Sequence, residues 1–142
     1  MMGEAPRDRV AAVAGMFYPA KPAEMRRMID AWLVPGDRPT QAWRAAIVPH
    51  AGWVYSGRIA ANVLSRIAFP PTVIVLCPKH RHGGAPRAVA PWQRWLFPGG
   101  VLESDQLLAK SLAARVPGLE LDDTPHRAEH AIEVLLPLLA HL

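Results

Sequence analysis

The chain has 142 residues, of which 51% are hydrophobic and 20% charged, a balance typical of a globular domain and not of a disordered or fibrous protein. Its 16 Lys and Arg residues outnumber its 12 Asp and Glu residues, so the net charge is +4 with neutral histidines. The basic residues are scattered and interleaved with acids, which argues against nucleic-acid binding. We expect a single domain over residues 1–142.

Neither a membrane span nor a disulfide framework is expected from this sequence. The longest apolar runs, residues 73–77 and 134–140, fall well short of the roughly 18 residues that a membrane-spanning helix needs. Residues 1–10 carry charges in place of the apolar core of a secretory signal. Cys77 is the only cysteine, which excludes an internal disulfide and a multi-cysteine metal cluster. These features predict a cytoplasmic protein with no membrane contact.

Apolar residues recur at helical spacing in several parts of the chain. The pattern predicts helices over residues 23–33, 56–67 and 105–115, and another from residue 127 onwards. Ser104 is expected to cap the third of these helices, and Pro137 to kink or break the last one.

Short apolar runs between the helices predict strands at residues 45–48, 72–77 and 87–90. Residues 72–77 are the clearest case, because they are apolar and β-branched on both faces, as in a parallel strand that is covered on both sides. The alternation of strands and helices predicts an α/β fold with a mainly parallel sheet and helices on both faces. The chain ends in the apolar stretch 135–142 without a polar tail, so we expect an incomplete portion of a larger fold.

Two histidines each follow an apolar run that predicts a strand. His50 comes after residues 45–48, and His80 comes shortly after residues 72–77. Because the carboxyl ends of parallel strands form the ligand site of an open α/β sheet, these two imidazoles are expected to converge on one point, such as a metal ion. The alternative is that each is an ordinary loop histidine bonded to a backbone carbonyl.

A second group of polar residues lies at helical spacing near the end of the chain: His126, Glu129, His130 and Glu133. Together with His50 and His80, either Glu129 or Glu133 could complete a site of two histidines and one carboxylate for non-haem iron. An ordinary polar helix face would produce the same spacing. The basic stretch from Lys79 to Arg94 could attract an anionic substrate, or could be a solvated loop. No nucleophile elbow and no glycine-rich nucleotide fingerprint is present.

Four segments in order resemble one protein family. They are AGMFYP at residues 14–19, PHAGWVYSG at 49–57, CPKH at 77–80 and EHAIEVLLPLL at 129–139. This combination is similar to the Memo family, whose prokaryotic members are also called AmmeMemoRadiSam system protein B. The resemblance covers almost the whole chain. Memo proteins are roughly twice this length on the domain-size scale, so the chain is identified as the N-terminal half of a Memo-like protein, truncated at its C-terminus.

The resemblance implies a metal site and its surroundings. Memo proteins are similar in fold to class III extradiol ring-cleaving dioxygenases, which use non-haem iron(II). This implies that His50 and His80 are metal ligands, with iron(II) as the expected metal and copper or zinc as alternatives. Phe17 and Tyr55 would line the pocket, and we place His130 and Glu133 there as well. The family pattern puts the third ligand in the absent half. His82 lies close to His80 and is the competing imidazole.

Three hypotheses about function follow. The first is a metal-dependent, dioxygenase-like oxidoreductase acting on a small molecule or peptide that the sequence does not identify. The second is a non-catalytic adaptor that uses the same pocket to bind a metal or a peptide. The third is an inactive truncated product, for which we expect self-association through an exposed apolar face.

Overall fold

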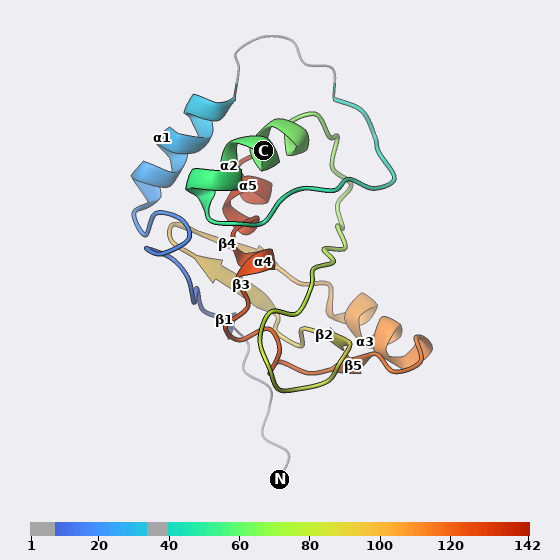
Figure 1. The fold of residues 1–142 in the computed structure, drawn as a ribbon. Helices are drawn as coiled ribbons and strands as arrows, with labels where there is room; N and C mark the ends of the chain where they lie inside the picture. Colours follow the sequence, from blue (N-terminus) through green and yellow to red (C-terminus); the bar gives the residue numbers. More distant parts are fainter. Residues whose placement is uncertain (1–7, 34–39) are drawn as a thin grey trace.

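The computed structural model describes residues 8–33 and 40–142, in which short strands are interspersed with helices (Figure 1). The described helices are α1 (Pro22–Trp32), α2 (Trp53–Leu64), α3 (Gln106–Arg115), α4 (His130–Glu133) and α5 (Leu136–His141). The described strands are β1 (Asp8–Arg9), β2 (Ala88–Val89), β3 (Arg94–Phe97), β4 (Gly100–Glu103) and β5 (Glu120–Leu121). Of the N-terminal stretch in which no secretory signal is expected, residues 1–7 lie outside this description. Among the described helices, none has the length and apolar character to cross a membrane.

The predicted helices are present, with corrections at their ends. Helix α2 begins at Trp53, so Ser56 lies inside it, where its hydroxyl donates to the carbonyl of Ala51 at 2.9 Å. Helix α3 is capped by Asp105 and not by Ser104, because the Asp105 carboxylate accepts from the Leu108 N–H at 2.9 Å. The last predicted helix is divided into α4 and α5, and Pro137 lies in the first turn of α5, where its missing N–H costs nothing.

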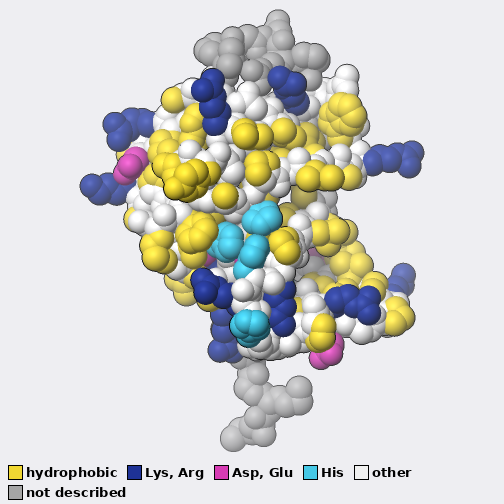
Figure 2. All heavy atoms as spheres, viewed as in Figure 1, with side chains coloured by type: hydrophobic (Ala, Val, Ile, Leu, Met, Phe, Trp, Pro, Cys, Tyr) yellow, Lys and Arg dark blue, Asp and Glu magenta, His cyan; other side chains and the backbone are white. Residues whose placement is uncertain are grey.

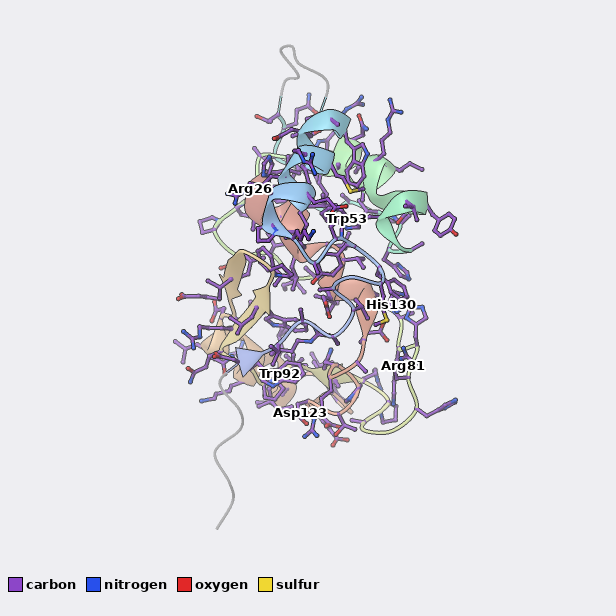
Figure 3. All side chains as sticks on the ribbon, turned by 90° about the vertical axis from the view of Figure 1, so that its left-hand side faces the viewer. Arg26, Trp53, Arg81, Trp92, Asp123 and His130 are labelled. Atoms are coloured by element: carbon purple, nitrogen blue, oxygen red, sulfur yellow. The ribbon has the colours of Figure 1, made fainter. Side chains whose placement is uncertain are left out.

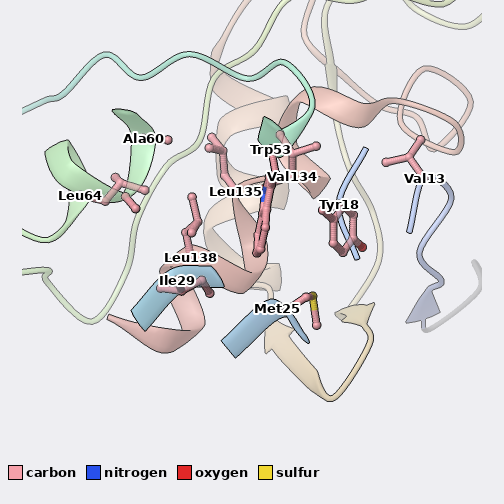
Figure 4. Close-up of a cluster of buried hydrophobic side chains, with 11 residues drawn as sticks. Val13, Tyr18, Met25, Ile29, Trp53, Ala60, Leu64, Val134, Leu135 and Leu138 are labelled. Atoms are coloured by element: carbon pink, nitrogen blue, oxygen red, sulfur yellow. The ribbon is translucent and has the colours of Figure 1, made fainter. Parts of the chain in front are cut away.

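A hydrophobic core forms where α1, α2 and α5 meet (Figure 4). Trp53 is at its centre: the indole packs edge-on against Trp32, with ring centroids 5.3 Å apart, and its N–H donates to the carbonyl of Val134 at 2.8 Å. Gly57 permits this packing, because a Cβ there would lie 2.5 Å from the Trp32 ring. The core therefore joins the start of α2 firmly to the last two helices.

Within the described residues, the structure has two small sheets and not the single, mainly parallel sheet that the sequence predicts. Strands β1 and β3 pair in parallel and β3 and β4 in antiparallel, while β2 and β5 form a separate parallel pair. The predicted strand near residues 87–90 is confirmed as β2. The hairpin of β3 and β4 was not predicted, although its turn contains Pro98-Gly99 and Gly99 has a φ of +81°, the left-handed region that favours glycine.

The strands predicted at residues 45–48 and 72–77 are not formed in the structure. Neither is a helix or a strand, and within the described chain neither pairs with another segment in a sheet. Their apolar side chains are not buried either: Ile47 is 95% exposed and Leu76 is 89% exposed. Figure 1 shows both segments as bare chain beside the helices. A strand of a parallel sheet needs at least one neighbouring strand and cover on both faces, and the described residues do not supply them.

One buried carboxylate connects the N-terminal segment to α4. Glu133 has no exposed surface and pairs with the buried guanidinium of Arg9. Its oxygens also accept hydrogen bonds from the backbone N–H groups of Ala12 and Val13, at 2.9–3.0 Å, and from the Tyr18 hydroxyl at 2.9 Å. Burial, reinforced by the Glu133 charge, raises the pKa of Tyr18, so this hydroxyl remains a donor.

Substituting Glu133 tests how much the fold depends on this carboxylate. Glu133→Gln keeps the size of the side chain but leaves the Arg9 guanidinium buried without a counter-charge. We expect the free energy of unfolding, measured by urea denaturation, to fall by about 3 kcal/mol or more. The control is Glu103→Gln on exposed β4, which should change it by less than about 0.5 kcal/mol. Equal stability of the two variants would show that the buried ion pair is dispensable.

Candidate metal centre

Three histidines converge on one side of the molecule. The candidate ligand nitrogens of His50, His80 and His130 all lie within 4.8 Å of one another. The ring centroids of His50 and His80 are 5.3 Å apart, and His130 lies 4.5 Å from His80 and 5.9 Å from His50. Figure 2 shows histidine side chains gathered at the middle of the face, between hydrophobic side chains above and Lys and Arg side chains below. We call these three residues the histidine cluster.

Separate parts of the chain hold each member of the histidine cluster. His50 lies at the end of the extended segment that precedes α2, and the N–H of Trp53 just beyond it donates to the carbonyl of Phe17 at 2.8 Å. His130 is the first residue of α4, and its ring lies 4.6 Å from that of Phe17. The backbone around the cluster is therefore tied to the core, while the His80 ring remains exposed.

Glu129 supports the cluster from behind. Its carboxylate accepts from the His80 backbone N–H and lies 2.8 Å from His80 Nδ1, so it orients this ring and leaves Nε2 free. It also caps α4 by accepting from the Ala131 N–H at 3.0 Å, and lies 3.3 Å from Nδ1 of His130. The sequence did not suggest this orienting role. The sequence feature that could have indicated a structural role for Glu129 is its position directly before His130, where an acid can cap a helix.

The electrostatics of the cluster favour an ionised Glu129 and a neutral His130. Burial by itself would raise the pKa of Glu129, but the hydrogen bonds from His80 and from the Ala131 backbone outweigh it and lower the pKa to about 2. Burial lowers the pKa of His130, and the neighbouring His80 and His50 act in the same direction. Neutral imidazole is the form that binds a metal.

The other predicted pocket residues take different positions. Phe17 lies against His130, as described above, whereas Tyr55 is 83% exposed on α2. Glu133 does not face the histidine cluster, because Arg9, Tyr18 and backbone N–H groups occupy its carboxylate in the core. It is a structural residue at this position and does not line the pocket.

The basic stretch after His80 is partly structural. Lys79 donates to the carbonyls of Gly84 and Ala85, at 3.2 and 3.3 Å, and so closes its own loop. Arg81 is exposed and lies on the same side of the molecule as His130 in Figure 3, and its charge contributes to the lowered pKa of that histidine. His82, the competing imidazole, is also exposed and does not belong to the histidine cluster.

The fold and the site define a mixed α/β protein that gathers three imidazoles in front of a buried carboxylate. Comparison with known proteins shows the family of the chain. The family model described as Memo-like protein matches residues 9–142. A MEMO1 family protein of Methanopyrus kandleri is 38% identical over 148 residues, and another of Aquifex aeolicus is 38% identical over 135 residues. The chain belongs to the Memo family.

The match covers nearly all of this chain but only part of each relative. The alignments include 95% and 94% of the chain, against 52% of the Methanopyrus protein and 49% of the Aquifex protein. A MEMO1 family protein of Methanosarcina barkeri, 35% identical over 133 residues, is matched over 49% of its length. The chain thus spans about half the length of the curated relatives that it matches.

Proposed function

We propose that this Memo-family chain binds a divalent metal between His50, His80 and His130. The observation that carries the proposal is the distance between the candidate ligand nitrogens, all within 4.8 Å of one another. Ligand nitrogens of one ion lie at about 2.0–2.1 Å from it, so two of them are at most about 4 Å apart when the ion is bound. The His80 ring is exposed and can therefore turn toward His50 and the more buried His130.

The surroundings of the cluster also suit a metal. Histidine ligands commonly donate their other ring nitrogen to a carboxylate, which fixes the tautomer and raises the basicity of the ligand. Glu129 occupies this position behind His80 and is held there by backbone N–H groups. The three imidazoles would thus hold the ion, and Glu129 would orient His80 toward it.

We further propose iron(II) as the metal and an oxidative activity related to that of class III extradiol dioxygenases. When bound, iron(II) supplies electrons and open coordination positions for a chelating substrate. The chain's own contribution would be to hold the ion at an open face, with Phe17 as an apolar wall beside His130. Arg81, exposed on the same side, would attract an anionic substrate.

A second candidate function is metal binding without oxidation, in a non-catalytic adaptor. It is favoured by the donor set, because the typical iron(II) site of non-haem oxygenases has two histidines and one carboxylate. Here Glu129 is bonded to His80, and Glu133 is bonded to Arg9 in the core. Three imidazoles suit zinc or copper as well as they suit iron.

Substituting single histidines tests the ligand set. We expect His50→Ala, His80→Ala and His130→Ala each to weaken binding of iron(II), copper or zinc by at least about tenfold, because each removes one of few ligands. The controls are His82→Ala, which is exposed and outside the cluster, and His141→Ala, whose ring lies 2.9 Å from Asp30. Anaerobic calorimetric titration measures the affinities. Equal losses of metal affinity for His80→Ala and His82→Ala would show that the ligand set proposed here is wrong.

Glu129→Gln tests the orienting carboxylate separately from the ligands. The amide oxygen can still accept from the Ala131 N–H, but the negative charge next to His80 Nδ1 is lost. We expect metal affinity to fall by about 10- to 100-fold, and the metal-free protein to lose about 1–3 kcal/mol of stability, because the amide NH2 faces the His80 backbone N–H that the carboxylate accepts. Glu120→Gln, an exposed position on β5, is the matched control. An unchanged affinity would mean that Glu129 only caps α4.

Oxygen consumption separates the two candidate functions. With iron(II) and a panel of catechols, the oxidative proposal predicts uptake that requires both the metal and the catechol and is lost in His50→Ala. The adaptor hypothesis predicts tight binding of zinc or copper and no uptake above that of iron(II) alone. Metal binding without any oxygen uptake would contradict the oxidative proposal and leave the metal site itself intact.

A further inference from the structure

A pocket lies between α1, the β3–β4 hairpin and α5. It has a volume of about 300 Å³, which falls within the size range of small-molecule sites. Side chains of α1 and α5 and the turn of the hairpin line it, and we call it the hairpin pocket. None of the three histidines of the cluster is among its lining residues, so it is separate from the candidate metal centre.

The inner wall of the hairpin pocket is apolar and fixed by core packing. Met25 and Ile29 line it and are only 4% and 1% exposed, and Pro137 is buried as well. Figure 4 shows Met25 and Ile29 on α1 among the core side chains. Because these side chains already pack against the core, they offer a preformed apolar surface to the body of a ligand.

The hairpin closes one side of the pocket because its turn contains two glycines. A Cβ at Gly99 would lie 2.6 Å from the Cβ of Pro22, at the start of α1. A Cβ at Gly100 would lie 2.4 Å from the Phe97 ring. Side chains at these two positions would push the turn away from α1, so the glycines preserve the shape of the pocket.

The charge at the hairpin pocket is positive. Arg26 lines the pocket, is exposed, and forms no ion pair or side-chain hydrogen bond with any residue that the structure describes. Asp30 lies four residues further along α1, where an acid can pair with such an arginine, but its carboxylate lies 2.9 Å from Nε2 of His141. None of the described residues that line the pocket is an Asp or Glu. The Arg26 guanidinium is therefore free beside an apolar wall.

We propose that the hairpin pocket binds a small monocarboxylate with a compact apolar body, such as an arylalkanoate. The planar guanidinium of Arg26 binds the two carboxylate oxygens through parallel N–H···O bonds. The apolar body lies against Met25 and Ile29. One guanidinium neutralises one negative charge, which favours a monoanion over a polyphosphate. This binding is independent of the proposed metal site and requires no metal.

Calorimetric titration of the full chain with phenylpropionate tests the proposal, in the presence of a chelator and without added metal. We expect saturable binding, and at least about fivefold weaker binding of phenylpropanol, which has the same apolar body but no charge. Arg26→Gln should weaken phenylpropionate binding at least about fivefold and leave phenylpropanol binding unchanged. The matched control is Arg27→Gln, because Arg27 is the exposed neighbour on α1 that does not line the pocket.

A second variant tests the pocket itself. Ala140 lines the pocket from an exposed position on α5, so Ala140→Trp places an indole where the ligand body would lie and should abolish binding of both probes. Ala114→Trp, at an exposed position on α3, makes the same change outside the pocket and should bind normally. Because all four positions are exposed, thermal unfolding of the variants should match that of the unmodified chain.

Several outcomes would overturn the proposal. They are no saturable binding of phenylpropionate, equal affinity for the acid and the alcohol, and equal affinity in Arg26→Gln and Arg27→Gln. Unchanged binding in a folded Ala140→Trp variant would also place the ligand elsewhere. Binding that is lost in Arg81→Gln but retained in Arg26→Gln would assign the carboxylate to the face of the histidine cluster, and the hairpin pocket would not be the site.

Discussion

The carboxylate of Glu133 holds the N-terminal segment against the last two helices, and the histidine cluster depends on that connection. Besides its pair with Glu133, the Arg9 guanidinium donates to the backbone carbonyls of Glu129 and His126, at 2.9 and 3.3 Å. The same arginine therefore fixes the turn that leads into α4. Because Glu129 and His130 stand at the start of α4, a charge pair buried in the core helps to fix where both side chains lie.

Several hydrogen bonds offset the free-energy cost of burying the Arg9–Glu133 pair. Backbone N–H groups and the Tyr18 hydroxyl surround the Glu133 carboxylate, and the guanidinium of Arg9 lies over the Trp95 ring, 5.2 Å from its centroid. Only the Nε of Arg9 lacks a hydrogen-bond partner among the buried side-chain atoms described. Such a network specifies one arrangement of its segments, because removing either charge leaves the other buried and unpaired.

The candidate metal centre combines a rigid support with accessible ligands. Glu129 and the helix that it caps are buried, whereas the His80 ring in front of them is exposed. A fixed carboxylate can set the orientation of an exposed imidazole without closing the site to a ligand. The groove that residues 43–47 form with the outer face of α2 is different in kind, since it is mostly apolar and bordered by Arg58 and Arg66. The histidine cluster is thus polar and accessible, whereas the groove is apolar.

Features that depend on neighbouring residues could be predicted from the sequence. The spacing of apolar side chains specifies α1 and α3, because a helix satisfies its backbone hydrogen bonds within itself. The resemblance of four short segments to the Memo family identified the family, and His50 and His80 stood out because each follows an apolar run.

Other features required the tertiary structure. The apolar character of residues 45–48 and 72–77 showed that these segments need burial but not whether a partner strand is available. Likewise, helical spacing gave no reason to choose between Glu129 and Glu133 as the carboxylate of the site. In the structure Glu129 contacts His80, whereas Glu133 pairs with Arg9, more than a hundred positions away. Strand pairing and the burial of a charge are decided by groups distant in the chain, so only the folded arrangement could determine them.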